Sequence, residues 1–160
     1  YDQLSTLHIR QHAFENPSTP SQALATAFSH LTQLTDLNMH ILGWDNEDCL
    51  QVLSALPRSL VILHCGHTLR HCKEPLALWK CLAELTHLQE LHAHALPGTS
   101  QAELAACLAK CGFDKLKDLG ISEQTDSCHI LESVCEASQH FTALTSLQLG
   151  KTAVLESSKF

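Results

Sequence analysis

The chain has 160 residues, a formal net charge of −7, 44% apolar residues and 5% aromatic residues. This length and apolar content suffice for one domain with a core, and they exclude a disordered chain because enough apolar surface is available for burial. The acidic balance argues against direct nucleic-acid binding, which needs a basic face, and no apolar run is long enough to span a bilayer.

Short strands and helices are predicted to alternate along the chain. The chain opens in a strand around Leu7 and Ile9, and the next strand is expected around Leu37 and Met39. Between the strands, apolar residues spaced three or four apart indicate amphipathic helices. In chain order, these predicted helices cover residues 21–30, 46–56, 75–85, 100–111 and 126–138.

Several helix boundaries carry their own signals. Asp45 is a suitable N-cap for the second helix, and Pro75 stands in the first turn of the third, where its missing N–H has no helical partner to lose. Ser100 and Glu103 form a capping-box pattern before the fourth helix, and Gly112 is a suitable residue to end it.

Leucine recurs along the chain at a nearly constant spacing. The chain holds 29 leucines, and the pattern Leu-x-x-Leu-x-x-Leu is clearest at 31–37 and 85–91. A unit of one short strand and one helix cannot bury its apolar side alone, so such units are stable only when stacked. The anchor leucines, 26 to 30 residues apart, are Leu4, Leu34, Leu60, Leu88, Leu116 and Leu144.

This pattern resembles the leucine-rich repeats of the ribonuclease-inhibitor-like class, in about five and a half repeats over the whole chain. The resemblance implies an α/β solenoid with short parallel strands on the concave face and helices on the convex face. It implies one domain over residues 1–160, which we expect to be part of a longer chain. The family's usual Asn or Cys after the strand is missing, which predicts irregular turns. The residues standing there are His12, Leu42, Thr68, Leu96, Gln124 and Thr152.

The outward positions of the predicted strands are rich in histidine. The resemblance implies that partners bind on the concave face, and a rigid sheet also lowers the ordering cost of binding. We therefore predict a non-catalytic module for protein recognition or scaffolding, without a cofactor. The expected contact residues on the strands are His8, Arg10, Asn38, His40, His64, Glu90, His92 and His94.

A metal site is the more specific alternative for the same face. His64 and His92 should be neighbours on adjacent strands, and His94 and His40 lie nearby in the pattern, with Glu90 the nearest carboxylate. Such residues suit zinc or copper, but a metal site needs three or four convergent ligands. The sequence therefore favours a polar recognition surface, and no metal is expected.

Other histidines and cysteines leave further alternatives open. A loop site built from His67, His71 and Cys72 is one, although no C-x-x-C pair accompanies it. Two helical pairs resemble half of a metal site, although apolar packing is favoured for both. These pairs are Cys107 with Cys111 and Cys128 with Cys135.

The two tryptophans are expected in different surroundings. Trp44 follows a strand at the expected rim of the concave face, where an exposed tryptophan would be a good binding hot spot. A packing role for Trp44 is the equal alternative. Trp79 adjoins the apolar stripe of its helix and is expected to be part core and part surface.

No motif for catalysis appears, since the sequence has no Gly-rich phosphate loop, no Gly-x-Ser-x-Gly and no His-Glu-x-x-His. Several of the eight cysteines fall at core positions and no signal peptide is visible, which favours reduced thiols and an intracellular, cytoplasmic location. Open solenoid ends would allow an oligomer or a larger assembly. A structural subunit of such an assembly is therefore an alternative function.

Overall fold

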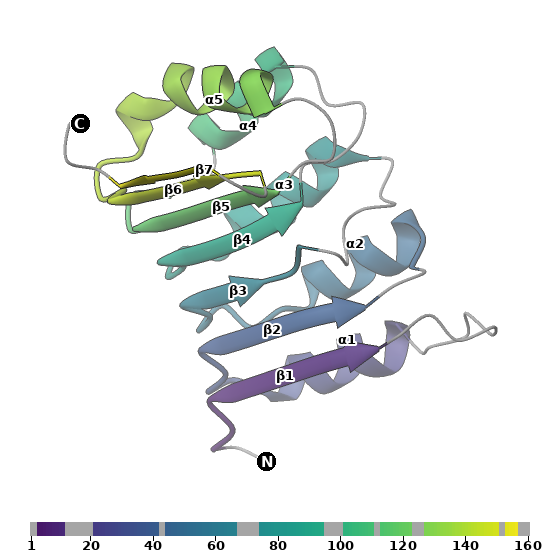
Figure 1. The fold of residues 1–160 in the computed structure, drawn as a ribbon. Helices are drawn as coiled ribbons and strands as arrows, with labels where there is room; N and C mark the ends of the chain where they lie inside the picture. The colour runs from purple at the N-terminus through teal and green to yellow at the C-terminus, as the bar shows by residue number, and fades with distance from the viewer. Residues whose placement is uncertain are drawn as a thin grey trace.

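The computed structural model describes residues 3–11, 21–41, 44–66, 74–94, 101–110, 113–122, 127–150 and 153–156. Within these ranges the protein has an α/β fold with one seven-stranded sheet, whose strands follow one another in sequence order (Figure 1). The first six strands are parallel and the seventh is antiparallel. They are β1 (Thr6–Gln11), β2 (Asp36–Ile41), β3 (Ile62–His64), β4 (Glu90–His94), β5 (Asp118–Ser122), β6 (Ser146–Leu149) and β7 (Ala153–Glu156).

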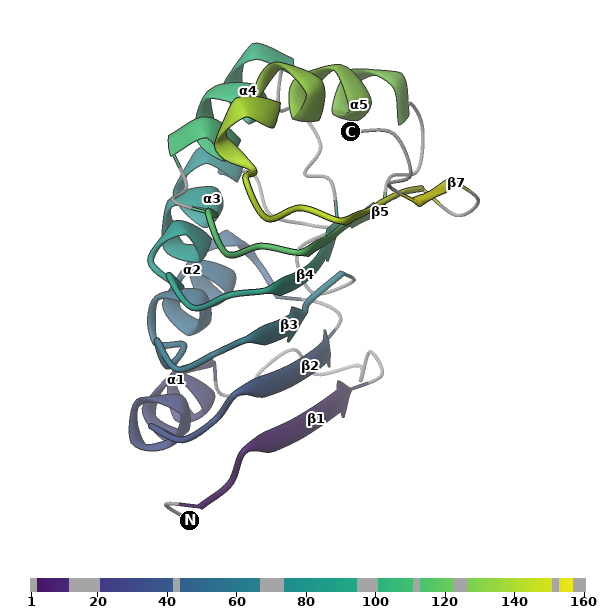
Figure 2. The ribbon, with the colours of Figure 1, turned by 90° about the vertical axis from the view of Figure 1, so that its left-hand side faces the viewer.

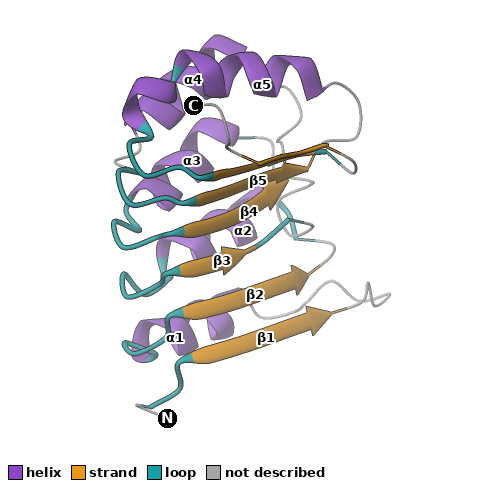
Figure 3. Ribbon diagram, turned by 60° about the vertical axis from the view of Figure 1, so that its left-hand side comes forward, coloured by secondary structure: helices purple, strands orange, loops and turns teal. Residues whose placement is uncertain are grey.

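A helix lies between each pair of consecutive parallel strands, and each helix packs against the next (Figure 3). None of the helices in the described ranges has the length and hydropathy needed to cross a bilayer. The helices are α1 (Ser21–His30), α2 (Asn46–Ser54), α3 (Pro75–Ala83), α4 (Gln101–Lys110) and α5 (Ser127–Glu136), with a short 3₁₀ helix, η1 (Ser138–His140), after α5.

All five predicted helices are confirmed, and their ends differ from the prediction by at most two residues. Two of the differences have a visible cause. After α2 and α3 the chain closes its last turn with tighter backbone bonds, in which Leu56 N donates to Leu53 O and Leu85 N donates to Leu82 O. Such bonds satisfy the last carbonyls of a helix but no longer follow the α-helical pattern.

The caps agree with the sequence where they are described. Asp45 is the N-cap of α2, and its Oδ1 accepts a hydrogen bond of 3.0 Å from the backbone N–H of Asp48. Pro75 stands at the start of α3. The predicted capping residue Ser100 and the predicted terminator Gly112 lie outside the described residues.

Leucines in register across the strands form the core. Leu37, Leu63, Leu91, Leu119 and Leu147 are consecutive partners from β2 to β6, and each is at most 4% exposed. Their side chains join one apolar cluster with the inward side chains of the helices, including Phe28, Leu53, Trp79 and Leu108. The side view shows α1 to α3 stacked on one side of the strands (Figure 2).

A second set of hydrogen bonds fastens the segments that lead into the strands. In each unit one backbone carbonyl accepts two N–H bonds from the following unit, at 2.8–3.0 Å. For example, the carbonyl of Val61 accepts from the N–H groups of Gln89 and Glu90. The carbonyls that do this belong to Ser5, Thr35, Val61, Gln89 and Lys117.

The two edges of the sheet differ. At one edge β7 pairs with β6, an element that the sequence did not predict. At the other edge lies β1, whose inward residues Leu7 and Ile9 are only partly buried, and the anchor Leu4 before it is 37% exposed. A strand with a neighbour on one side only cannot bury its apolar side chains as fully as an inner strand.

One predicted core position in α5 is wrong. Apolar packing was favoured for Cys135, but its side chain is exposed. Val134 and the polar Ser133 are buried instead, and Ala137 follows on the same face. Residues three and four apart share a helix face, so the buried face is centred on Ser133, Val134 and Ala137.

Candidate functional site

The face of the sheet opposite the leucine core carries mainly polar side chains. Side chains of a strand alternate between the two faces, so each buried leucine is flanked by residues that point to the other side. We call this side of β1 to β6 the open face. It consists of Thr6, His8, Arg10, Asp36, Asn38, His40, Ile62, His64, Glu90, His92, Asp118, Gly120, Ser122, Ser146 and Gln148.

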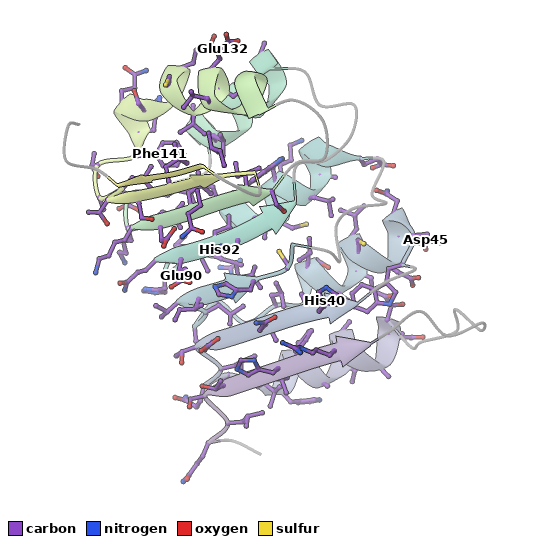
Figure 4. The ribbon with its side chains drawn as sticks, viewed as in Figure 1. His40, Asp45, Glu90, His92, Glu132 and Phe141 are labelled. Atoms are coloured by element: carbon purple, nitrogen blue, oxygen red, sulfur yellow. The ribbon has the colours of Figure 1, made fainter. Side chains whose placement is uncertain are left out.

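Three of the predicted site residues form a cluster at the centre of this face. Strand pairing places His64 of β3 directly beside His92 of β4, as predicted. Glu90 precedes His92 by two residues on β4, on the same face of the sheet (Figure 4). The His64 and His92 ring centroids are 4.5 Å apart, with the ring planes inclined by 57°. We call His64, Glu90 and His92 the His–Glu–His cluster.

The carboxylate of Glu90 lies between the two imidazoles. Nε2 of His64 donates a hydrogen bond of 2.7 Å to Oε1 of Glu90, and Nε2 of His92 lies 3.5 Å from the same oxygen. One ligand atom from each of the three side chains lies within 4.8 Å of the other two. The cluster therefore presents two imidazoles and a carboxylate to one point, a set that suits a transition-metal ion.

Asp118 of β5 adds a second carboxylate beside the cluster. Its Oδ1 lies 3.8 Å from Nε2 of His92. Both atoms are buried, and neither has a hydrogen-bond partner in the described part of the chain. Buried polar atoms without a partner are uncommon in folded proteins, and their desolvation is costly.

The surroundings of His92 favour its neutral form. Burial lowers the pKa of His92 from its ordinary value, and the neighbouring His64 lowers the pKa further. Asp118 and Glu90 act in the opposite direction but do not outweigh burial. A neutral imidazole keeps a lone pair on one ring nitrogen, which is the state that accepts a hydrogen bond or binds a metal.

A glycine on the next strand makes room for the His92 ring. Gly120 is the register partner of His92. A Cβ atom at this position would lie 2.8 Å from Cε1 and 2.9 Å from Cγ of His92, and closer still to Nδ1. These separations are too short for carbon in van der Waals contact, so any larger residue at position 120 would force the ring of His92 to move.

The other predicted strand residues whose side chains the structure describes lie on the same face but outside the cluster. His8 and Arg10 are exposed on β1, the edge strand, while Asn38 and His40 are partly buried on β2. His94 pairs with Ser122 through the backbone. The side chain of His94 is not among those that the structure describes.

Trp44 is buried and is not exposed at the rim of the sheet. It was expected as an exposed residue at the rim or, alternatively, as a packing residue; the structure shows it 3% exposed and part of the core cluster. It stands directly before the N-cap Asp45, a position whose apolar side chain commonly turns back toward the first turn of the helix. The buried Cys49 lies in that first turn. Trp79, expected to be partly at the surface, is also buried, at 1%.

Several alternatives for metal sites fall outside the described residues. The loop set His67, His71 and Cys72 is one, and another is Cys111 together with the side chain of Cys107. The same holds for the side chain of Cys128, while its predicted mate Cys135 is exposed. Cys65, directly after β3, is fully buried.

Sequence reasoning missed Asp118 and Gly120 as parts of the site. Both occupy outward positions in the predicted pattern, one repeat after Glu90 and His92. A signal for them was therefore present, because a neighbour in register is always close in a sheet. The pattern gives no side-chain rotamer, so the approach of the His92 ring toward β5 could not be read from it.

The chain matches no protein-family model, no curated protein and no solved structure. The arrangement of the open face and of the His–Glu–His cluster is therefore the basis for a functional argument.

Proposed function

We propose that the chain is a leucine-rich-repeat solenoid that recognises a protein partner through the open face of its sheet. The observation that carries this proposal is the in-register display of partly exposed polar side chains on one side of a sheet whose other side packs on helices. A surface held by strand pairing loses little conformational freedom when it binds, which favours affinity.

The charge of the open face indicates the chemistry of the partner. Asp36, Glu90 and Asp118 lie in one column across β2, β4 and β5, and Arg10 on β1 is the only lysine or arginine of the face. With neutral imidazoles the face is acidic. A partner segment with lysine or arginine side chains would complement it, and complementary charge also speeds association.

The experiment is site-specific photocrosslinking in cells that express the chain. A photoreactive residue is placed at Asn38 or Gln148 on the open face, and at the exposed Gln22 on α1 as the control for the helix layer. The proposal expects the same protein adduct from both open-face positions and none from Gln22. Adducts from Gln22 alone, or from no position, would overturn it, and Gln22 adducts would favour the structural subunit expected as an alternative.

Two charge-reversal substitutions test whether the acidic column takes part in recognition. Asp36→Lys should reduce the adduct formed at Asn38, because it places a positive charge against a basic partner segment. Asp114→Lys is the matched control, since Asp114 is exposed in the turn before β5 and outside the open face. Equal effects of the two substitutions would contradict recognition by the acidic column.

A further inference from the structure

The His–Glu–His cluster has a composition and geometry that a simple polar surface does not need. We propose that His64, Glu90 and His92 bind a divalent transition-metal ion, for which zinc is the best fit, with Asp118 supporting the site. The proposal stands whether or not the open face binds a protein, because it depends only on side chains within the chain.

The distances are close to those that zinc requires. Zinc bonds to nitrogen and oxygen are about 2.0–2.1 Å long, so two ligand atoms of a tetrahedral site lie about 3.4 Å apart. Nε2 of His92 and Oε1 of Glu90 are 3.5 Å apart, while Nε2 of His64 and Oε1 of Glu90 are 2.7 Å apart. All three ligand atoms lie within 4.8 Å of one another. Small rotations of the side chains are therefore enough, with the proton on the His64 ring moved from Nε2 to Nδ1 so that Nε2 has a free lone pair, and the backbone can stay in place.

The unpaired polar atoms point to the same conclusion. Among the described residues, Nε2 of His92 and Oδ1 of Asp118 are buried without a hydrogen-bond partner, 3.8 Å from each other. A metal ion would take the lone pair of the imidazole nitrogen. The carboxylate of Asp118 would then serve as a fourth ligand or orient a water molecule on the ion, as carboxylates beside metal ligands do.

The donor set selects among metals. Two imidazole nitrogens and one carboxylate oxygen suit zinc and its neighbours in the first transition series. Calcium and magnesium prefer oxygen ligands alone, and copper(I) prefers sulfur. The cluster contains no sulfur ligand and only one carboxylate, so zinc should bind more tightly than calcium or magnesium.

Gly120 gives the proposal a test that removes no ligand. The ring of His92 occupies the space that a side chain at position 120 would need. Gly120→Ala should therefore displace the ring and weaken metal binding, although every proposed ligand is retained. If the cluster is only a set of hydrogen-bonded side chains, the wild-type chain binds no metal there, and Gly120→Ala has no metal affinity to reduce.

The experiment titrates the purified 160-residue chain with zinc chloride by isothermal titration calorimetry. His64→Gln and Glu90→Gln should each weaken zinc binding by at least about 10-fold, and Asp118→Asn by about 10-fold. His30→Gln is the matched control, since His30 is exposed at the end of α1, and it should leave the affinity unchanged. Circular dichroism verifies that each variant is folded, and His64→Gln alters a side chain that is already partly exposed.

The chain also contains eight cysteines, and cysteine thiolates bind zinc as well. A second measurement must therefore identify the type of ligand. Cobalt(II) in place of zinc gives visible absorption bands for a tetrahedral nitrogen–oxygen site, without the near-ultraviolet band of a thiolate ligand. The proposal expects this spectrum and its loss in Glu90→Gln. Three results would overturn it: no zinc binding, equal affinity in wild type and Glu90→Gln, or a thiolate band that persists in His64→Gln.

Discussion

Phe113 and Phe141 stack on one another although they are separated by one full strand–helix unit. Their ring centroids are 6.4 Å apart, their planes are inclined by only 11°, and both are at least 93% buried. Each ring stands three residues before an anchor leucine, so the repeat of the sequence becomes a physical contact between neighbouring units.

Truncation of this pair should be costly. Phe141→Ala is expected to lower the free energy of unfolding by about 3–5 kcal/mol, because it removes a large buried ring and leaves a cavity. Urea denaturation measures the change. Gln139→Ala, at an exposed neighbouring position, should stay within about 0.5 kcal/mol of wild type. Similar small changes in both variants would show that the stack contributes little.

The pKa of His92 should lie below the ordinary histidine value of about 6.5. Burial and His64 lower its pKa, whereas Asp118 and Glu90 raise it. Imidazole NMR shifts recorded against pH in metal-free buffer measure this value. We expect Glu90→Gln to lower the pKa further and His64→Gln to bring it back toward 6.5. A pKa above 6.5 in wild type would contradict this assignment.

Because the pKa of folded His92 is lowered, the free energy of unfolding should rise with pH. Because the folded pKa of His92 is below the unfolded one, the unfolded chain binds more protons between the two values. The contribution of His92 to stability is therefore fully present above about pH 6.5. It is lost as the pH falls through the folded pKa. Urea midpoints for wild type and His92→Gln should diverge least at low pH.

The N-cap of α2 offers a local test of helix stability. Asp45→Ala removes the acceptor for the N–H of Asp48 and should cost about 0.5–2 kcal/mol. Asp45→Ser keeps an acceptor oxygen and should recover most of this loss. Thermal unfolding of the three proteins gives the comparison, and an alanine variant as stable as wild type would show that the cap is dispensable.

Two thiols should differ in reactivity. Burial raises the pKa of Cys81, and Glu84 raises it further, so little reactive thiolate forms near neutral pH. Cys135 is exposed. Iodoacetamide followed by peptide mass spectrometry should label Cys135 faster than Cys81 in the folded chain. In urea the difference should shrink, and a faster reaction at Cys81 in the folded chain would contradict the burial described for it.

The sequence allowed the alternation of strands and helices to be predicted because leucine periodicity reports burial directly. It also predicted that His64 and His92 are neighbours, since equal spacing from the anchor leucines sets the register. It did not decide between exposure and packing for Trp44, because the burial of this side chain depends on how the chain enters α2. It failed at β7, an antiparallel strand that follows the last repeat and lies outside the regular leucine spacing.

The site was predictable only in part for a similar reason. Strand alternation assigns Glu90 and Asp118 to the same face, but it does not say which carboxylate meets the imidazoles. That choice depends on rotamers and on the space left by Gly120. A periodic pattern describes positions along the backbone, whereas a metal-binding geometry is decided by side-chain torsions.

The double hydrogen bonds that precede the strands tie each unit to its immediate neighbours and to nothing further away. Opening of one unit should therefore expose only the adjoining amides, so protection from hydrogen exchange should be graded along the sheet. Amides of Gln89 and Glu90, at the middle of the series, should exchange more slowly than those of Thr35 and Asp36 near the β1 edge. The His–Glu–His cluster would then occupy the part of the chain that opens least often.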